Sequence, residues 1–496
     1  MKPVKIIILM QFVLANVFAQ FPHQDSSYFF LFGNDNTEEF RDGCNHSLDS
    51  GYVMVGSTSS FSGDGSDIYI VKTDWKGKTL WSRTIGGPGV ENGFSIKETP
   101  DHGFILGGFT NSNINHDYNM LLIKTDSEGF VQWQKTYGGA DWDFLYSVAL
   151  TPDSGFVLCG ETYSFGNLSS DIYLIRTDKN GDTIWTKNYG GPGKDAANKI
   201  ITTSDGNIVA VGYSESNSVG QKDLFLLKCN LSSGDSIYSK KFGGQFNDEA
   251  RSVVEHTALD SGYVLVGYTE SFTSAHDKDL LLLKFNKDGS LMWQDHFGNN
   301  GGNDEATCIY SQGINFFVSG YTANGAGVCD LAAGVVDLFG NWQWNQSTSY
   351  GSYEADIAWS NFKSLRDHFV FVGSTQSFGS IDQDAMIIVV DTIQFQFQNV
   401  HTSSDSLVGV METVTSEYSF FPNPANEFLL LNFKRPIGSG SAIKVFDFSG
   451  KMVLSNDLTV GENIFYLDIS NLSAGIYEVS FFLAGKIFNH KLSIVH

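Results

Sequence analysis

An acidic residue recurs at one place in each of several similar segments, in a turn that leads into an apolar run. The seven residues are Glu38, Glu91, Asp143, Asp195, Asp248, Asp304 and Asp356. If the segments form a ring, these carboxylates would surround the mouth of a central channel, and their oxygens are ligands that Ca²⁺ accepts. The alternative is that each accepts hydrogen bonds from backbone N–H groups of the preceding glycine turn, such as Gly138-Gly139. We favour hydrogen bonding, with calcium as the sharper hypothesis and no other cofactor expected.

Catalysis requires a paired acid and base, a nucleophile with its histidine, or a cluster of metal ligands, and the sequence singles out none of these. The histidines fall at scattered positions of the repeat, namely His46, His102, His116, His256, His276, His296 and His368. Carboxylates are plentiful, so a glycosidase with two carboxylates stays open, although no pair is selected. The Gly-Gly pairs precede strands and lack the helix and lysine of a phosphate-binding loop. We therefore expect no catalytic residue.

The segments that carry these acids are copies of one repeat. A glycine closes the pattern aromatic-Val-x-Val-Gly about every 52 to 55 residues, at Gly56, Gly108, Gly160, Gly212, Gly267, Gly320 and Gly373. A basic residue ends a later alternating run in five copies, at Lys72, Lys124, Arg176, Lys228 and Lys284. A third register is aromatic, at Trp81, Trp133, Trp185, Tyr238, Trp293 and Trp344. The chain is therefore a repeat protein with seven copies.

Each copy contains four strand-like runs separated by Gly, Asp and Pro signals. In the third copy these are Tyr146 to Leu150, Phe156 to Gly160, Asp171 to Arg176 and Thr183 to Tyr189. Four strands in about 52 residues fit one propeller blade, since a solenoid coil is about half as long and an immunoglobulin-like unit about twice as long. The sequence predicts an all-β, seven-bladed β-propeller with almost no helix.

The hairpin between the third and fourth runs is the most regular local pattern, as in Asp178-Lys-Asn-Gly181-Asp-Thr-Ile-Trp185. Glycine takes the positive φ of the turn, and the Asp caps it. The tryptophan returns on the outer strand, where we expect it to pack against the neighbouring blade. A sugar-stacking platform is the alternative, but such a platform does not require an aromatic residue at the same place in nearly every blade.

Two segments compete to complete the last blade. Tyr28 to Gly33 reads YFFLFG and resembles the end of a fourth strand, whereas the last copy ends in the altered run Ile393 to Gln398. If the N-terminal segment completes the blade, strands from both ends of the repeat region close the ring and remove a free edge. We hold this closure as a hypothesis.

The termini predict export. Residues 1–19 have Lys2 and Lys5, an apolar run and Val17-Phe18-Ala19, the arrangement of a secretory signal peptide cleaved after Ala19. The propeller is expected over 20–398, a Ser/Thr/Val-rich linker over 399–417 and a small antiparallel sandwich over 418–496. No cysteine follows the cleavage site and no later run reaches about 18 apolar residues. We therefore expect neither a lipid anchor nor a transmembrane anchor.

Composition restricts the partners. The formal net charge is −24, and clustered Lys and Arg that would bind phosphates are missing, so a nucleic-acid partner is excluded. The acidity is suited to the solubility of an exported protein. Five cysteines, Cys44, Cys159, Cys229, Cys308 and Cys329, fall in no CxxC pair. We expect most of them to be small buried side chains, with a bridge between Cys308 and Cys329 as the open alternative.

The C-terminal unit resembles the type A sorting domain of the type IX secretion system of Bacteroidota. The residues that carry the resemblance are Phe421, Pro422, Asn423, Pro424, Asp447, Gly450, Lys451, Leu472, Gly475, Tyr477, Gly485, Lys486 and Lys491. The family usually has Tyr where Phe421 stands, and often a basic residue where His496 ends this chain. The resemblance implies an immunoglobulin-like sandwich, passage across the outer membrane by the type IX secretion machinery, and release or attachment at the cell surface.

The repeats resemble those of propeller proteins exported by the same system, which share segments of the types DGGY, DxYLIKTD and GDTLW. More loosely, the spacing from Gly77 to Trp81 is similar to the tryptophan-docking repeats of quinoprotein-like propellers. Those enzymes use eight blades, and their vicinal cysteines and cofactor-binding residues have no counterpart here. An Asp-box of sialidase type is also suggested by the turn, but its spacing differs and no arginine triad is evident.

These observations together predict a secreted or surface-attached, non-catalytic propeller that acts in binding or adhesion, with a glycan or protein ligand. The alternative, by analogy with exported proteins that carry this sorting domain, is an extracellular hydrolase that degrades polysaccharides. A purely structural surface component is a third option. Specificity is expected in loops that differ between copies, namely Asn111 to His116, Thr273 to Lys278 and Ala323 to Val328.

Overall fold

The computed structural model describes residues 28–494 with gaps at 34–35, 61–64, 113–115, 167–168, 219, 258–261, 274–275, 299–300, 314, 324–327, 351–353, 377–382, 391–417, 422–427, 434–441, 447–450, 459–463, 474 and 484–485. The predicted signal peptide and linker lie outside the described residues. The chain divides into two compact units, Met1–Val400 and His401–His496. All regular elements in the described part are strands, as the composition predicts.

The first unit consists of seven four-stranded antiparallel sheets. Blades 1 to 3 are β2 (Glu38–Asn45), β3 (Tyr52–Thr58), β4 (Asp67–Thr73), β5 (Thr79–Ile85); β6 (Glu91–Glu98), β7 (Phe104–Thr110), β8 (Asn119–Thr125), β9 (Val131–Tyr137); and β10 (Asp143–Leu150), β11 (Phe156–Thr162), β12 (Asp171–Thr177), β13 (Thr183–Tyr189). Blades 4 to 6 are β14 (Asp195–Thr202), β15 (Asn207–Ser214), β16 (Asp223–Asn230), β17 (Ser236–Phe242); β18 (Asp248–His256), β19 (Gly262–Thr269), β20 (Asp279–Phe285), β21 (Leu291–Phe297); and β22 (Glu305–Gln312), β23 (Asn315–Ala323), β24 (Cys329–Val336), β25 (Trp342–Tyr350). Blade 7 combines β26 (Asp356–Lys363), β27 (Phe369–Thr375) and β28 (Asp384–Val390) with β1 (Tyr28–Phe32).

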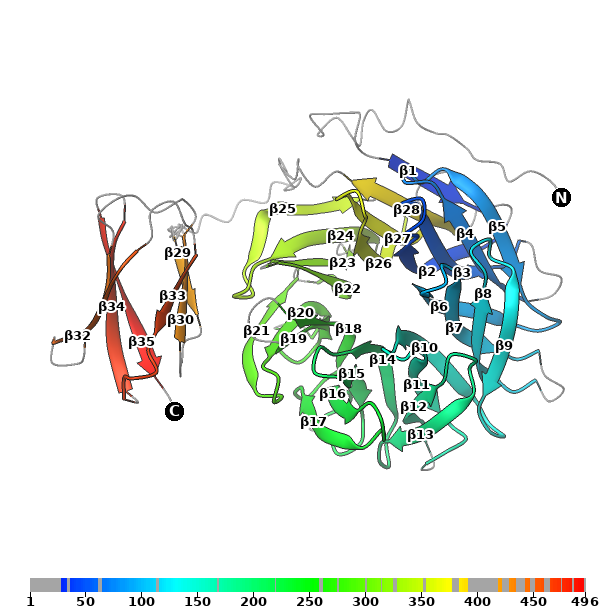
Figure 1. Cartoon of the computed structure of the whole chain (residues 1–496), viewed down its shortest axis with the longest axis horizontal. Helices are drawn as coiled ribbons and strands as arrows, with labels where there is room; N and C mark the ends of the chain where they lie inside the picture. Colours follow the sequence, from blue (N-terminus) through cyan, green and yellow to red (C-terminus); the bar gives the residue numbers. More distant parts are fainter. Residues whose placement is uncertain are drawn as a thin grey trace. The chain divides into compact units, whose positions relative to one another are not determined.

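The blades surround a common axis, so the predicted seven-bladed propeller is confirmed (Figure 1). In each blade the first strand faces the centre and the fourth lies at the periphery. The middle strands are buried on both faces, as in β11 and β12, because neighbouring blades cover them. The outer strand β13 alternates between exposed and half-buried residues, since only one of its faces packs on the blade. The strands read from the sequence therefore agree with this burial pattern.

The N-terminal segment completes blade 7. β1 pairs antiparallel with β28, from Tyr28 opposite Val389 to Phe32 opposite Ala385. Figure 1 shows this dark blue strand beside the yellow strands of the same blade. The hypothesis that strands from both ends of the repeat region close the ring is thus confirmed. Closure pairs the edge of β28, which would otherwise offer its backbone groups to another chain.

The outer-strand aromatic residues of blades 1 to 5 pack on the hairpin glycine of the next blade, as predicted from the sequence, whereas the side chain of Trp344 in blade 6 lies outside the described residues. Gly129 has a φ of +79°, and a Cβ placed there would lie 2.5 Å from the ring of Trp81. The same arrangement joins Trp133 to Gly181 and Trp293 to Gly340. Across the closure, Phe30 of β1 packs on Gly77 of blade 1, where blades 1 to 5 use Trp or Tyr on the next blade's glycine. Glycine is required here for both its conformation and its missing side chain.

Replacing Gly129 by Ala should therefore destabilise the propeller by more than the cost of its positive φ, which is about 1 to 2 kcal/mol. The added methyl group would displace the Trp81 ring. Gly206 is the matched control, because it has a φ of +76° but no neighbouring atom within 4 Å of a built Cβ. Thermal and urea unfolding of Gly129→Ala and Gly206→Ala measure the difference. Equal losses in the two variants would contradict packing of Trp81 on this glycine.

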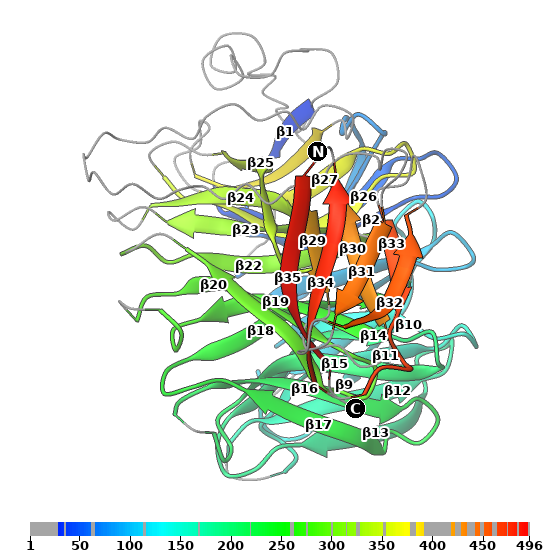
Figure 2. The same ribbon diagram turned by 90° about the vertical axis from the view of Figure 1, so that its left-hand side faces the viewer.

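The second unit forms two antiparallel sheets. One is ordered β29 (Tyr418–Phe421), β30 (Phe428–Phe433), β33 (Ile464–Asp468), and the other β32 (Met452–Asp457), β31 (Ala442–Phe446), β34 (Gly475–Leu483), β35 (Lys486–Ile494). Figure 2 shows β34 beside β35, with which it pairs from Gly475 opposite Ile494 to Leu483 opposite Lys486. The unit is all-β, as the alternating sequence predicts.

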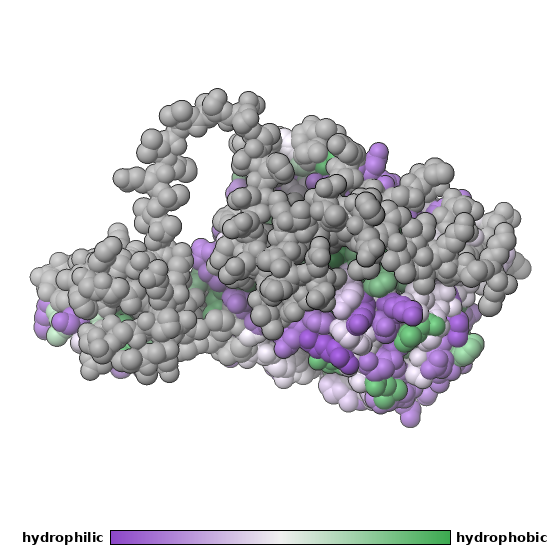
Figure 3. Space-filling model, turned by 90° about the horizontal axis from the view of Figure 1, so that it is seen from above, coloured by the Kyte–Doolittle hydropathy of each residue, from purple (hydrophilic) through white to green (hydrophobic). Residues whose placement is uncertain are grey.

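The five cysteines are all free thiols, so the bridge between Cys308 and Cys329 is not formed. Cys159, Cys229 and Cys308 are buried, as expected for small apolar side chains. Burial raises the pKa of the Cys229 thiol to about 11, which keeps it protonated. In the described part of the chain no helix is long and apolar enough to cross a membrane. On the face shown in Figure 3, hydrophobic side chains of the described residues lie in small groups among hydrophilic ones.

Candidate ligand-binding channel

A cavity of about 530 Å³ lies at the centre of the propeller, and residues of all seven blades line it. The lining residues are Arg41, Asp42, Phe94, Tyr146, Glu161, Ala196, Asn198, Lys199, Tyr213, Lys222, Glu249, Arg251, Tyr268, Lys278, Thr307, Cys308, Trp359 and Ser360. This volume is in the range of small-molecule sites, which are about 300 to 1,000 Å³. We call this cavity the central channel.

A β-bulge in the first strand of every blade supplies the channel lining. In blade 3 the pairing of β10 with β11 shifts between Leu145 and Ser147, so Tyr146 is the extra residue. The same shift occurs three residues after the acidic residue of every blade. The seven bulged residues are Arg41, Phe94, Tyr146, Asn198, Arg251, Thr307 and Trp359. Each of them lines the channel. Bulges commonly direct side chains toward functional sites.

The bulged residues differ in chemistry although their strands are equivalent. Two are cationic, three are aromatic, and the other two carry an amide and a hydroxyl group. Among structural positions of the repeat, by contrast, the closing glycine and the acidic residue are kept in every copy. Because the scaffold does not dictate these seven side chains, they are the residues through which the channel would select a ligand.

Blades 4 to 6 contribute a charged arc centred on Arg251. Its guanidinium group lies 2.6 Å from a carboxylate oxygen of Glu249 and 2.5 Å from one of Glu305. Each glutamate has a second cation, with Lys222 3.2 Å from Glu249 and Lys278 3.1 Å from Glu305. Both carboxylate side chains are almost fully buried. Such a network is costly to desolvate and persists only when every charge is paired.

The cations of this arc keep the carboxyl groups of Glu249 and Glu305 ionised. Burial acts to raise the pKa of Glu249, but the positive charges of Arg251 and Lys222 outweigh it and hold the pKa below its usual value. Burial likewise opposes ionisation of Glu305, and Arg251 and Lys278 again lower the pKa. Both glutamates therefore stay ionised at neutral pH. Two lysines also face aromatic rings, Lys222 at 3.7 Å from the centroid of Tyr213 and Lys278 at 3.8 Å from that of Tyr268.

Asp42 of blade 1 joins three blades. Its carboxylate accepts hydrogen bonds from Lys97 Nζ at 2.7 Å, from the Ile96 backbone N–H at 3.1 Å and from Ser360 Oγ at 2.8 Å. Burial acts to raise the pKa of Asp42, but the charges of Lys97 and Lys199 hold it well below its usual value. Asp42 is therefore a buried, ionised carboxylate.

Lys199 of blade 4 also lines the channel, and the negative charge of Asp42 raises its pKa against the opposing effect of burial. Within the described part of the chain, Lys199 Nζ forms no hydrogen bond and no ion pair within 4.0 Å. Asp42 itself is bonded to Lys97 instead. The three N–H donors of this ammonium group are thus left to solvent or to a ligand.

Blades 7, 1, 2 and 3 line the rest of the channel and contribute its three aromatic bulged residues, in contrast to the charged arc of blades 4 to 6. The Arg41 guanidinium lies 4.0 Å from the ring centroid of Trp359 and 5.6 Å from that of Phe94. Phe94 meets Tyr146 edge to face at 5.5 Å. The Tyr146 hydroxyl donates to Glu161 at 2.6 Å, so this lining carboxylate is also bonded. The channel therefore combines stacking surfaces with charged groups.

The acidic residues selected from the sequence lie elsewhere. All seven are buried at the start of the first strands, and none lines the channel. Asp248 is representative, because its carboxylate accepts from the Gly244 N–H at 2.9 Å and from Ser271 Oγ at 2.6 Å, as well as from Thr269. Glycine N–H groups bond Glu91, Asp143 and Asp195 in the same way. These four acids therefore accept hydrogen bonds from the preceding glycine turn, which is the role that the sequence analysis favoured over calcium binding.

In the described part of the structure, no group of three or more His, Cys, Asp or Glu side chains is placed to hold a metal ion. The ring of Glu38, Glu91, Asp143, Asp195, Asp248, Asp304 and Asp356 as a calcium site remains a prediction that this geometry does not favour. One hydroxyl bond of the same kind is repeated in most blades, between Glu38 and Thr58, Glu91 and Thr110, Asp195 and Ser214, and Asp356 and Thr375.

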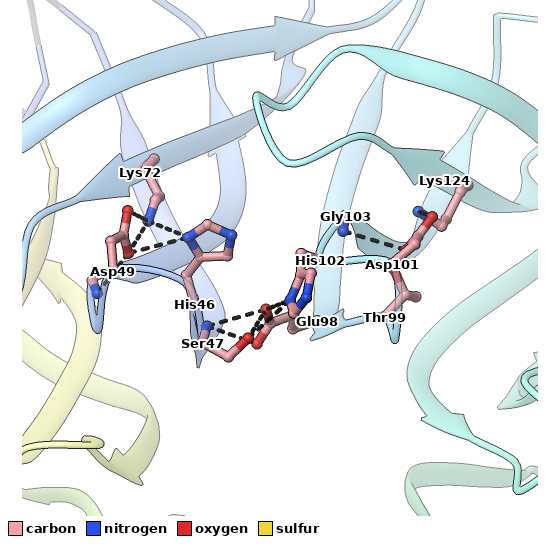
Figure 4. Close-up of polar contacts among 11 residues, drawn as sticks. His46, Ser47, Asp49, Lys72, Glu98, Thr99, Asp101, His102, Gly103 and Lys124 are labelled. Carbon is pink, nitrogen blue, oxygen red and sulfur yellow. Dashed lines mark hydrogen bonds and ion pairs between the residues drawn. The ribbon is translucent and has the colours of Figure 1, made fainter.

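The opposite ends of the inner strands carry a polar cluster that contains Ser, His and Glu (Figure 4). Ser47 Oγ and Glu98 both contact the same ring nitrogen of His102, Nδ1, at 3.0 and 3.2 Å. A catalytic histidine must contact the nucleophile and the acid through different nitrogens. The same Ser-to-Glu bond joins Ser204 to Glu255 without a histidine. The cluster therefore links neighbouring blades.

The basic residues that recur in the third strands have a structural role in the same region. Lys72 lies 2.7 Å from Asp49, Lys124 2.9 Å from Asp101, and Lys228 2.6 Å from Asp205. Figure 4 shows the first two of these pairs. Each aspartate is part of the turn between the first two strands, so the pair fixes the turn against the blade. Hydrogen bonds from Lys228 and neighbouring groups lower the pKa of Asp205 to about 2 despite the opposing effect of burial.

The sorting-motif residues are only partly described. Pro422, Asn423, Pro424 and Gly450 lie outside the described residues. Gly475 begins β34, Tyr477 follows in the same strand, and Lys491 lies in β35. The Tyr477 hydroxyl donates to the Ser473 carbonyl oxygen at 2.8 Å, which fixes the turn before β34. Of the variable loops, 113–115, 274–275 and 324–327 are likewise not described, but Lys278 at the end of one loop reaches the channel.

The fold and site define a seven-bladed β-propeller whose central channel is lined by variable residues. Residues 419–494 match the family described as the secretion system C-terminal sorting domain. This match confirms the type IX sorting tail at the C-terminus and indicates export through that secretion machinery. The match covers the second unit only, so it does not assign the propeller to a family.

Similarity to other proteins is distant. The chain is 24% identical over 182 residues to the regulatory protein FlaEY of Caulobacter vibrioides, covering 32% of this chain and 19% of that protein. It is 25% identical over 223 residues to the uncharacterized WD repeat-containing protein L264 of Acanthamoeba polyphaga mimivirus, covering 30% and 16%. The chain thus spans less than a fifth of the length of these curated relatives.

Among solved structures, Sqt1 from Chaetomium thermophilum matches with a TM-score of 0.42 and 10% identity over 71% of this chain and 82% of that one. The propeller domain of the Trilobed protease from Pyrococcus furiosus matches with a TM-score of 0.36 and 12% identity over 71% and 91%. Similarities of this size carry no information on activity.

Proposed function

We propose that this chain is a secreted or surface-attached, non-catalytic binding protein whose ligand site is the central channel. The observation that carries the proposal is the set of seven bulged side chains, which differ from blade to blade yet converge on one cavity. A scaffold role would repeat the same residue in each blade, as the glycine of the second strand does from Gly56 to Gly373. A purely structural component would have no need of a polar cavity of this size.

The carboxylates that line the channel also support a non-catalytic role. Asp42 is bonded to Lys97 and Ser360, Glu161 to Tyr146, and Glu249 to Arg251 and Lys222. A general acid or base must exchange a proton with a substrate, and it needs an accessible oxygen to do so. These carboxylates instead complete the framework that positions the cations and aromatic rings.

Export and anchoring belong to the same proposal. We infer that residues 1–19 are a signal peptide, that 399–417 are a linker, and that the unit over 418–496 is an immunoglobulin-like sandwich recognised by the type IX machinery. The sorting-domain match over 419–494 supports the last step. The mature propeller would then meet its ligand, a glycan or a protein, outside the cell.

Binding to a panel of insoluble and soluble polysaccharides tests the proposal. The purified chain should be retained by at least one of them without releasing fragments, and Trp359→Ala should weaken retention about tenfold because an aromatic anchor of the channel is lost. Phe130→Ala is the control, since Phe130 lies on an outer hairpin and is 58% exposed. Released fragments would contradict the non-catalytic role. Retention that is unchanged in Trp359→Ala would contradict the channel as the site.

A further inference from the structure

A continuous series of aromatic side chains leads from the channel to the rim of blades 2 and 3. Starting from Tyr146 and Phe94, neighbouring rings follow at centroid distances of 5.6 Å to Phe109, 5.0 Å to Phe144, 5.3 Å to Tyr118 and 5.6 Å to Trp142. We call these six residues the aromatic track. Its outer end, Trp142, is 48% exposed. The track therefore leads from the channel lining to an exposed tryptophan, and Phe109 is its buried member.

Phe144 and Trp142 of the aromatic track are not part of the repeat scaffold, whereas the position of Phe109 is also aromatic in blades 4 to 6, as Tyr213, Tyr268 and Tyr321. The position of Phe144 is taken by Glu39, Asn92, Ala196, Glu249, Glu305 and Ile357 in the other blades, as the strand pairing shows. The position of Trp142, just before the acidic residue, is aromatic in blade 3 alone. Because the other blades fold without aromatic residues at the positions of Phe144 and Trp142, packing between blades does not account for these two rings. Exposed tryptophan beside a cavity is typical of ligand contact.

Charge gives a second, independent indication of the ligand. The chain as a whole is strongly acidic, with a formal net charge of −24, yet cations outnumber carboxylates among the channel-lining residues. The carboxylates of the lining are bonded to their own partners. Lys199, in contrast, forms no hydrogen bond or ion pair with any described residue. An ammonium group held in a partly enclosed cavity attracts an anion more strongly than one at the surface.

We propose that the channel and the aromatic track bind an acidic polysaccharide, a chain of uronic-acid sugars. One sugar carboxylate pairs with Lys199, and the following sugar rings pack on aromatic side chains of the track. This inference rests on the proposed function and names its ligand class. Sugar rings have apolar C–H faces that pack on aromatic rings and hydroxyl groups that bond to polar neighbours. A neutral polysaccharide would leave the Lys199 ammonium unpaired, and a small anion alone would not use the track.

Affinity measurements with matched ligands test this inference. Oligomers of galacturonate, of mannuronate and guluronate, and of glucuronate are titrated into the full purified chain by calorimetry, each beside its methyl ester. Esterification removes the charge and keeps the rings. At least one acid form should bind, and its ester should bind at least about tenfold more weakly, which is the loss expected when one partner of a buried charge pair is removed.

Two variants separate the contributions of charge and stacking. Lys199→Gln should weaken binding of the acid form about tenfold and leave binding of the ester unchanged, while Lys179→Gln, on an exposed outer turn, should change neither. Trp142→Ala should weaken both forms about three- to tenfold. Melting curves confirm that the variants are folded. The comparison of acid and ester needs no variant, so it still tests whether the charge of the ligand contributes to binding if Lys199→Gln does not fold.

The outcomes distinguish this inference from the proposed function. Equal binding of acid and ester would overturn the assignment of an acidic ligand and leave the channel as a binding site. Binding of the acid that is indifferent to Lys199→Gln and Trp142→Ala would place the anion elsewhere and overturn the inference. If no uronic-acid oligomer binds while a neutral polysaccharide is retained, the ligand class is wrong but the proposed function stands. No binding to any polysaccharide overturns this inference and the glycan form of the proposed function, and leaves a protein as the remaining ligand class.

Discussion

Replacing Phe32 by Ala should lower the free energy of unfolding of the propeller by about 3 to 5 kcal/mol, the usual cost of truncating a buried phenylalanine. Phe32 is 1% exposed and its ring lies 5.3 Å from that of Phe40 in blade 1. It belongs to a core cluster that unites β1 with the first and last blades. Since β1 is only five residues long, this one side chain supplies much of the apolar burial that holds the closing strand. Urea unfolding followed by tryptophan fluorescence measures the change.

Phe130→Ala serves as the control for this loss. Phe130 is 58% exposed and contacts the guanidinium of Arg83, so its removal should cost less than about 1 kcal/mol. Deleting residues 20–34 should exceed the effect of Phe32→Ala and lower the melting temperature by many degrees, because β28 then loses its paired neighbour. If the deletion leaves the melting temperature unchanged, the ring does not depend on β1. Equal effects of the two phenylalanine variants would also contradict this closure.

The repeat made most of the propeller predictable. The glycine after each aromatic-Val-x-Val run must be a glycine because an added Cβ at Gly160 would lie 1.8 Å from the backbone carbonyl oxygen of Phe144. A requirement of that kind is met in every blade, so it appears in the sequence as a strict period. The hairpin glycines and their aromatic partners follow the same logic. Structural features that the blades share can be predicted because the residues they require recur in the sequence at the period of the repeat.

The channel could not be predicted in the same way. Arg41, Tyr146 and Arg251 stand at equivalent positions but share no chemistry, and residues without a common pattern are not selected by a search for repeats. The available signal was the third residue after each acid, where the seven copies carry different kinds of side chain. Its meaning depends on the β-bulge, which turns that residue to the axis, and on closure of the ring, which brings distant blades together.

The acidic residues illustrate the reverse case. Their strict recurrence suggested a shared ligand, yet recurrence is the mark of a scaffold role in a repeat protein. Glu91, Asp195 and Asp248 accept hydrogen bonds both from the preceding glycine turn and from a hydroxyl group of the second strand. Such bonds satisfy groups that burial would otherwise leave unpaired. In this propeller the constant residues build the blades and the inconstant ones line the cavity.

Replacing Arg251 by Met should destabilise the chain by about 3 kcal/mol at pH 7. The substitution leaves Glu249 and Glu305, each 2% exposed, with one lysine apiece, and breaking a buried ion pair from one side costs about 3 to 5 kcal/mol. The lower end of this energy range is expected because Lys222 and Lys278 still pair with the two glutamates. Removing one buried carboxylate as well, in Arg251→Met with Glu305→Gln, should recover part of the loss. Urea unfolding of the single and double variants measures both effects.

The dependence on pH follows from the sign of the pKa shifts. In the native chain the pKa values of Glu249 and Glu305 lie below their usual value, so their stabilisation is present above about pH 4.3 and is lost as the pH falls through the folded pKa values. In Arg251→Met both pKa values rise, since burial is less opposed, and the variant takes up protons at a higher pH than the native chain. The difference in stability should therefore be largest at neutral pH and shrink below about pH 5. A difference that is the same at pH 7 and pH 4.5 would mean that Arg251 stabilises the channel by packing rather than by charge.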